Sequence, residues 1–180
     1  MTAQAPKTET RAEQRKHVHE ILSMMPDVMF LTYEETGPRP VQKGRPLHVT
    51  HLDDDGGMWF MVALDSRKVQ DLRGFDQAMV TGQHDSRWIE LAGTGVIVTD
   101  RTRIRQLWNK LHEAWFPLGS DDPNVCLIHF QPHHAEYWDN SGMVGVKYLF
   151  EVAKALVTGQ AADDVKGTHG KTEGRVSSRH

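Results

Sequence analysis

The stretch DDDGGMWFMVALDSRK, residues 53–68, carries the strongest local signals for the fold of this chain. Its acidic and glycine-rich start, 53–57, has the composition of a hairpin turn. The apolar run 58–62 that follows predicts a buried strand. Asp65-Ser66 is typical of a helix start, and a short helix is predicted over 67–73. A hairpin turn that leads into a buried strand favours antiparallel pairing.

Similar signals recur on both sides of this stretch. Further strands are predicted over 28–33, 78–83, 87–99 and 125–130, with 135–138 extending the last one past Pro132, and an extended segment over 39–52. Helices are predicted over 10–25, from Asp100 to about residue 113, and over 148–157. Gly93 and Gly95 indicate a β-bulge or a close backbone approach. Because short turns join most strands, the pattern favours a mainly β (α+β) fold, with six to seven strands in an antiparallel sheet or barrel and peripheral helices.

Composition and charge exclude several classes of protein. The chain has 180 residues, a formal net charge of −3 and a pI of about 6.4, which argues against a strongly basic nucleic-acid-binding protein. It has no apolar run near the roughly 20 residues that span a bilayer, and its polar start lacks the apolar core of a signal peptide. We therefore expect a soluble, cytoplasmic protein with no membrane or nucleic-acid partner.

The two ends of the chain differ from its middle. Residues 1–9 and 158–180 are polar and poor in large aliphatic residues, so we interpret them as an N-terminal tail and a disordered C-terminal tail around one domain over 10–157. Cys126 is the single cysteine of the sequence, which excludes an intramolecular disulfide. Its apolar neighbours indicate an inert core thiol.

Ser66, Arg67 and Lys68 are the best local candidates for a binding site. Backbone N–H groups at a helix N-terminus are unpaired, and the helix dipole is positive there. A hydroxyl, a guanidinium and an ammonium complete a cradle for an anion, and two cations suit a phosphate monoester, which carries roughly −1.5 to −2 charges. The alternative interpretation is a plain helix cap followed by exposed basic residues.

Arg45 lies on the preceding extended segment. If that segment pairs with the strand 58–62, Arg45 can approach the same anion. Pro46 removes a donor from the ladder and leaves nearby backbone free for a ligand. The alternative is an edge strand with a surface arginine.

Two other groups of residues are weaker candidates. His129, His133 and His134 suggest a metal site, although His133 and His134 would point to opposite faces of a strand and the chain has no HExxH spacing. Aromatic residues in or beside loops, Trp115 among them, suit stacking on a planar ligand, a subunit interface or a small core under the loop.

Several short segments occur in an order typical of a known family. They are Gly44–Leu47 (GRPL), Gly57–Phe60 (GMWF), Ser66–Lys68 (SRK), Gly93–Gly95 (GTG), Ala114–Gly119 (AWFPLG) with Asp121–Pro123 (DDP), and Ala135–Asp139 (AEYWD). Together with the helix that ends at Met25 they span about residues 15–160 and resemble the general stress protein branch of the pyridoxamine 5′-phosphate oxidase-like flavoproteins, the FMN-binding split barrels. The ordered set is specific where the single segments are not.

The resemblance implies an antiparallel split β-barrel that forms a homodimer, with FMN in two equivalent clefts at the interface. It implies a phosphate site at Ser66, Arg67 and Lys68, with Arg45 as the upstream arginine. It also implies that a set of residues surrounds the flavin ring: Pro46, Leu47, His48, Met61 and Val62, with Trp115 reaching the cofactor or the interface from the partner subunit. The same cradle and cleft would also serve FAD.

Three positions depart from the family pattern. Val62 stands where a threonine is usual, Leu47 where a methionine is common, and Thr50 where the pyridoxamine phosphate oxidases proper have a lysine. The C-terminal Arg and His segment that binds substrate in those oxidases has no match here. Oxidation of vitamin B6 is therefore not expected.

The residues and the resemblance together predict an FMN-binding flavoprotein of the general stress type. The activity expected is that of a flavin-dependent oxidoreductase, with hydride or electron transfer through flavin N5, NAD(P)H as a candidate reductant and His48 as a weak acid–base candidate. Three alternatives stay open: a non-catalytic flavin carrier or stress-linked interaction protein, a split barrel that binds deazaflavin or haem, and a metal-dependent enzyme.

Overall fold

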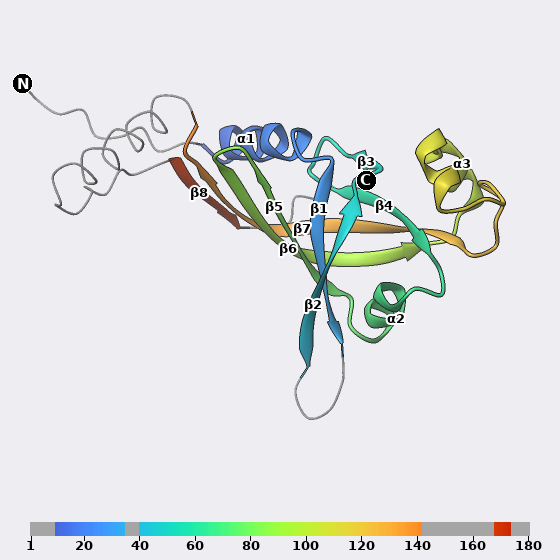
Figure 1. The fold of residues 1–180 in the computed structure, drawn as a ribbon. Helices are drawn as coiled ribbons and strands as arrows, with labels where there is room; N and C mark the ends of the chain where they lie inside the picture. Colours follow the sequence, from blue (N-terminus) through green and yellow to red (C-terminus); the bar gives the residue numbers. More distant parts are fainter. Residues whose placement is uncertain (1–9, 35–39, 142–167, 174–180) are drawn as a thin grey trace, which may run out of the picture.

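The computed structural model describes residues 10–34, 40–141 and 168–173. Its helices are α1 (Arg11–Ser23), α2 (Arg67–Gly74), α3 (Arg101–Leu107) and the 3-10 helix η1 (Lys110–Ala114). Its strands are β1 (Asp27–Glu34), β2 (Val41–His48), β3 (His51–Leu52), β4 (Met58–Ala63), β5 (Gln77–His84), β6 (Arg87–Val98), β7 (Val125–Asp139) and β8 (Thr168–Glu173). Within these ranges the strands form one curled antiparallel sheet with the helices at its periphery (Figure 1), so the predicted fold class is confirmed. None of the helices in these ranges has the length and hydropathy of a membrane-spanning segment.

The chain itself joins the two edges of the curled sheet. The strand order is β2-β1-β5-β6-β7-β4-β3, with β8 added beside β7. The edge strands β2 and β3 are separated by Val49 and Thr50, whose N–H groups donate to Pro26 O at 2.7 Å and to Trp59 O at 2.8 Å. The curl is closed at this point. Away from this point β2 stays paired with β1 and β4 stays paired with β7. The two strands β2 and β4 are therefore not paired with each other, and the barrel is split between them.

Alternate residues of the strands fill the interior of the curl. On β4 the side chains of Met58, Phe60 and Val62 are buried in the main core, as the period of two in a strand requires. The rings of Phe30 and Phe60 lie 5.2 Å apart and those of Phe30 and Phe130 lie 6.0 Å apart, both edge to face. This geometry adds to the stabilisation from burial. The apolar side of α1 packs on the same core, and a second cluster lies between α3, β4 and β7.

The helix predicted from Asp100 to about residue 113 is interrupted. It begins at the Asp100 cap as expected, but α3 ends at Leu107. The Asn109 side chain then accepts a hydrogen bond from Leu111 N at 2.9 Å, and Asn109 N donates to His112 Nδ1 at 3.0 Å. These side chains compete with the helix backbone and start η1, so one predicted helix becomes two.

The extended segment 39–52 divides between two partners. β2 pairs with β1 from Asp27↔His48 to Glu34↔Val41, whereas the two residues of β3 pair with β4. The pairing with the strand 58–62 that would bring Arg45 to the anion site therefore does not occur along β2. A long extended segment that lies next to two strand edges can supply backbone hydrogen bonds to both, because each half pairs with a different strand.

A bulge lets β7 continue past Pro132. Its register against β6 passes from Gly93↔Pro132 to Ala92↔His134, so His133 is the extra residue of the bulge. Pro132 has no N–H to give to the ladder, and a bulge is one of the places where a sheet tolerates this. The predicted strands 125–130 and 135–138 are thus one strand.

Part of the predicted C-terminal tail is a strand. Residues 168–173 form β8, which pairs antiparallel with 134–139 of β7. The prediction that 158–180 lacks structure is wrong for this stretch. Backbone hydrogen bonds to β7 hold the segment in place. The sequence did not indicate a strand here, because the segment has no large apolar residues. The helix predicted over 148–157 lies outside the described residues.

The bulge makes Gly93 a position where no side chain fits. A Cβ atom there would lie 2.4 Å from Gln131 O and 2.7 Å from the Phe130 ring, so the predicted close backbone approach is confirmed. We expect Gly93→Ala to lower the free energy of unfolding by about 1–3 kcal/mol or more, because the backbone must move.

Gly74→Ala is the control for this substitution. A Cβ atom at Gly74 would meet nothing within 4 Å, so the change should be within about 1 kcal/mol of the wild type. Urea denaturation of both variants measures the difference, and equal stabilities would contradict the close contact at Gly93.

Candidate functional site

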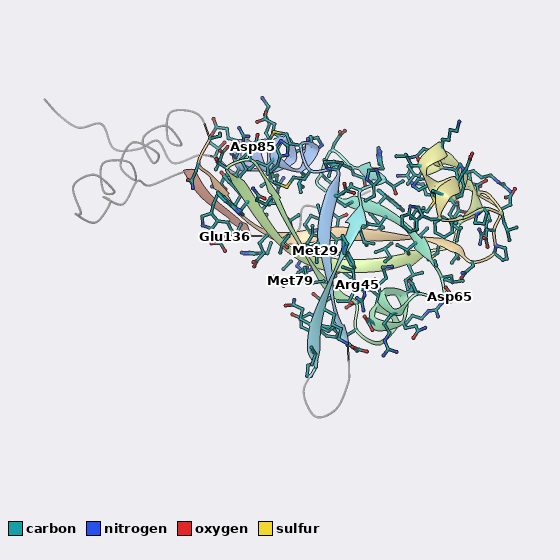
Figure 2. The ribbon with its side chains drawn as sticks, viewed as in Figure 1. Met29, Arg45, Asp65, Met79, Asp85 and Glu136 are labelled. Carbon is teal, nitrogen blue, oxygen red and sulfur yellow. The ribbon has the colours of Figure 1, made fainter. Side chains whose placement is uncertain are left out.

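Arg45, Thr32 and Asp71 form a hydrogen-bonded group where β2, β1 and α2 meet; Figure 2 labels Arg45 on β2. Thr32 Oγ1 donates to Asp71 Oδ2 at 2.7 Å, and Arg45 Nη1 donates to Thr32 Oγ1 at 2.9 Å. Arg45 Nη2 donates to the same Asp71 oxygen at 3.3 Å. Thr32 and Asp71 are buried, whereas 25% of the Arg45 side chain is exposed. Arg45 thus ties the edge strand to α2 and keeps part of its guanidinium open to solvent.

Lys68 is half-buried close to this group. Burial lowers the pKa of Lys68 below its ordinary value, and the positive charge of Arg45 lowers it further. The two cations are therefore near enough to repel each other. Among the residues that the structure describes, Lys68 has no ion-pair or hydrogen-bond partner. A bound anion would stabilise an ammonium in this position.

Ser66 precedes α2, and its side-chain hydroxyl does not cap the helix. It has the extended backbone of a helix cap, but its side chain makes no capping hydrogen bond. Its buried Oγ has no hydrogen-bond partner in the part of the chain that the structure covers. The first N–H groups of a helix also lack intrahelical partners. A buried hydroxyl, open N–H groups and the Lys68 ammonium fit the oxygens of a phosphate.

Arg67 is held by a different partner. Its Nε donates to Glu34 Oε1 at 2.9 Å, and Lys43 forms an ion pair with the other carboxylate oxygen. Hydrogen bonds from Lys43 and Arg67 hold the pKa of the buried Glu34 below its ordinary value. Arg67 lines a cavity of about 210 Å³ that also borders Glu34 and Phe75. The structure therefore brings Lys68 and Arg45 together but directs the charge of Arg67 to Glu34.

The predicted ring-lining residues of β2 lie on an edge strand. Pro46 and His48 are exposed, and Leu47 is partly buried against the main core. His48 Nδ1 lies 3.0 Å from Asp27 Oδ1 on β1. The strand therefore presents backbone and two exposed side chains beside the split.

The Thr50 hydroxyl, between β2 and β3, contacts β4 at the closed end of the split. Thr50 Oγ1 accepts a hydrogen bond from Met61 N at 3.2 Å and lies 3.4 Å from Nε2 of the buried His112. Burial lowers the pKa of His112 below its ordinary value, as does the positive charge of His48, so His112 is neutral at pH 7. The Val62 side chain is 3% exposed and packs in the core, so a ligand contact there would come from its backbone.

Trp115 follows η1 and points into solvent. It is 81% exposed, and Leu118 and Leu111 are exposed at 74% and 66%. Phe116, the neighbour of Trp115, is buried in the second cluster. Three large apolar side chains on one short segment are thus mostly exposed.

Three residues that organise the charges of the site were missed from the sequence: Thr32, Glu34 and Asp71. Thr32 and Glu34 occupy the inward-facing positions of β1 that continue the alternation of Phe30, and both are buried. Asp71 lies three residues after Lys68, on the same side of the helix. A polar residue at an inward strand position was the available signal, since a buried polar group requires a partner.

Two of the candidate metal ligands on β7, His129 and His133, have partners within the protein. The ring of His129 stacks on Trp59 with centroids 4.0 Å apart, and its Nε2 lies 3.2 Å from Asp53 Oδ2. His133 Nε2 lies 3.1 Å from Thr94 Oγ1. Over residues 10–34, 40–141 and 168–173, no group of three metal-ligating side chains occurs.

The sequence as a whole matches a known family. The profile of the family described as pyridoxamine 5′-phosphate oxidase like covers residues 13–163. The chain belongs to this family. As a pyridoxamine 5′-phosphate oxidase-like protein it has a curated relative, protein bli-3 of Neurospora crassa, which is 27% identical over 121 residues. That match covers 61% of this chain and 57% of bli-3, so the chain spans less than two thirds of that relative.

Solved structures described as general stress proteins have the same fold. General stress protein 26 from Jannaschia sp. CCS1 is 25% identical, with a TM-score of 0.67 over 90% of this chain and 99% of that chain. The general stress FMN/FAD binding protein of Xanthomonas citri is 21% identical, with a TM-score of 0.59 over 74% of this chain and 92% of that chain. The resemblance to the general stress branch of the pyridoxamine 5′-phosphate oxidase-like proteins is confirmed.

The unpaired charge of Lys68 costs this family member stability. Because the pKa of Lys68 is lower in the folded chain than its ordinary 10.5, the protonated side chain opposes folding at neutral pH. The penalty disappears as the pH rises through the folded pKa toward 10.5. We expect Lys68→Met to raise the free energy of unfolding at pH 7, and this gain to shrink as the pH rises.

Lys43→Met is the matched control. It removes a lysine whose charge is paired with the buried Glu34, so it should lower stability. Urea denaturation at pH 7 and at pH 10 compares the two variants with the wild type. A less stable Lys68→Met protein, or a gain that does not depend on pH, would contradict the unpaired charge.

Proposed function

We propose that this protein binds FMN in the split between β2 and β4, with the phosphate at the N-terminus of α2. The observation that carries the proposal is a pair of polar groups two residues apart. Among the described residues, neither the buried Ser66 Oγ nor the Lys68 ammonium has a hydrogen-bond partner. Open N–H groups at the same helix start favour an anion. Arg45 adds a guanidinium that is partly open to solvent.

Family membership supports a flavin as the ligand. The Xanthomonas citri protein of the same fold is described as binding FMN or FAD. Ser66 and Lys68 suit one phosphate group, so we propose FMN as the natural ligand, and FAD binding is tested beside it. Thr50 replaces the lysine of the pyridoxamine phosphate oxidases, so oxidation of vitamin B6 is not proposed.

We propose further that the protein is a flavin-dependent oxidoreductase. The flavin would supply hydride or electron transfer at N5, with NAD(P)H as the candidate reductant. The chain would supply binding and orientation: Lys68 and Ser66 hold the phosphate, and neutral His112 keeps the Thr50 hydroxyl beside the Met61 backbone. The second candidate function is a non-catalytic flavin carrier. The observation that favours it is Val62, whose side chain packs in the core and offers no hydroxyl to a flavin.

A homodimer completes this proposal. Trp115, Leu111 and Leu118 expose apolar surface on one segment of each chain, and a neighbouring subunit would cover it. Trp115 would then reach the cofactor or the interface of the partner subunit. Aromatic residues are common anchors of such interfaces.

The binding test uses FMN and riboflavin, which differ in the phosphate. FMN should bind saturably at about one per chain, and Lys68→Met should weaken it by about tenfold to a hundredfold because a charged hydrogen bond is lost. Riboflavin should bind wild type and variant equally. Quenching of flavin fluorescence measures both ligands.

Lys16→Met, which removes an exposed lysine on α1, is the control and should leave FMN affinity unchanged. Equal losses for FMN and riboflavin in Lys68→Met would place the phosphate elsewhere. A protein that takes up no flavin would end the proposal, and a Soret band or deazaflavin absorbance would then show the ligand. Bound FMN without NAD(P)H turnover would favour the carrier.

The dimer is tested at its apolar segment. Replacing both Trp115 and Leu118 by serine should raise the dimer dissociation constant by about tenfold or more, since buried aromatic anchors dominate interfaces. Trp88→Ser, which removes a tryptophan that is 42% exposed on β6, should leave it unchanged. Sedimentation equilibrium measures the constants, and a monomeric wild type would contradict the dimer.

A further inference from the structure

We propose that Asp71 determines how tightly this protein holds a phosphate group, because its carboxylate offsets the charge of Arg45 beside the site. The inference rests on the proposed flavin site and extends it to a residue that acts through Arg45. Asp71 is therefore a specificity-determining residue for the anion, and it acts through its charge.

Burial and hydrogen bonding make Asp71 a strong partner for Arg45. Five per cent of the Asp71 side chain is exposed. Its Oδ2 accepts hydrogen bonds from the Thr32 hydroxyl at 2.7 Å and from Arg45 Nη2 at 3.3 Å. Arg45 Nη1 donates to Thr32 Oγ1 at 2.9 Å. Both terminal nitrogens of the guanidinium thus have buried acceptors before any ligand is present.

The site holds less net positive charge than its cations indicate. Arg45 and Lys68 bring two positive charges, and Asp71 offsets one of them at the Arg45 guanidinium. Lys68 and Asp71 lie three residues apart on one side of α2, so the carboxylate is on the side of the helix that carries the ammonium. A phosphate at Lys68 is attracted by Arg45 and repelled by Asp71, so the carboxylate reduces the net attraction.

This balance acts on the charge of the ligand. The phosphate monoester of FMN carries about −1.5 to −2 charges at pH 7, whereas each phosphate of the FAD pyrophosphate carries about −1. Coulomb energy grows with the charge of the ligand, so the carboxylate penalises FMN more than FAD. Asp71 thereby weakens phosphate binding and narrows the preference for FMN over FAD.

Asp71→Asn removes the charge and keeps the shape and an acceptor for Thr32. We expect the variant to bind FMN about threefold to tenfold more tightly at low ionic strength, with a smaller gain as salt screens the charges. FAD binding should improve less, and riboflavin binding should not change. Calorimetric titration with FMN, FAD and riboflavin at low and high salt measures all three.

Thr32→Val is the matched control, because it removes hydrogen bonds from the same group without changing its charge. It should leave FMN affinity within about threefold of the wild type, because the charges around the phosphate do not change. If both variants weaken FMN binding, Asp71 acts by holding Arg45 in place and the proposal is overturned. An equal gain for FMN and riboflavin also overturns it, since riboflavin has no phosphate.

A second variant keeps the test valid if Asp71→Asn does not fold. Asp71→Ser removes the same charge with a smaller polar side chain and leaves Arg45 in place. We expect it to bind FMN more tightly than the wild type at low ionic strength, again by about threefold to tenfold. A folded Asp71→Ser protein that binds FMN no better than the wild type contradicts the proposal.

Failure of the flavin site gives a different result from failure of this inference. If wild type binds FMN and Asp71→Asn binds it no better, the inference alone fails. If the folded wild type takes up no FMN but Asp71→Asn does, the proposed function fails for the natural chain, whereas the effect of the Asp71 charge is supported. If none of the folded proteins binds FMN, the flavin site and the inference fail together.

Discussion

The hydrogen bonds of Val49 and Thr50 join the two edges of the sheet, and the rest of the structure depends on this closure. One continuous stretch of chain serves β1 on one side and β4 on the other. The position where the curl closes is therefore set by connectivity, and the split begins on either side of it. Thr50 places a hydroxyl at the closed end, and Arg45 lies farther along β2. The helix that follows β4 then brings Lys68 to the same opening.

Polar groups around the split come in pairs. Glu34 takes the charges of Lys43 and Arg67, and Asp71 takes Arg45. Native proteins pair nearly all buried polar groups, so groups left over in one place need an explanation. In the described ranges the polar groups of Ser66 and Lys68 are left without partners, and they are close together in the sequence. The proposed anion site would explain this cost in stability, because a bound phosphate would pair with both groups.

Local patterns in the sequence were sufficient for much of the fold. The turn, strand and helix signals of 53–73 and the close approach at Gly93 each depend on neighbouring residues or on backbone geometry, and the structure confirms them. The partner of β2 depends on competition between two distant strand edges, which no local pattern reports. The same holds for Arg67, whose position beside Ser66 and Lys68 suggested a shared cradle. Its actual partner, Glu34, is 33 positions away along the chain.

β7 is long enough to need cover along two different parts of one edge. β6 pairs with one side of it, while β4 takes 125–130 and β8 takes 134–139 on the other. Without β8, this second stretch would present a row of unpaired N–H and C=O groups. Open strand edges of this kind recruit strands from other molecules and lead to aggregation. The polar segment 168–173 therefore protects this edge of β7 from pairing with other molecules. A chain that ends before Thr168 would expose the edge, and we expect it to associate with other chains through it.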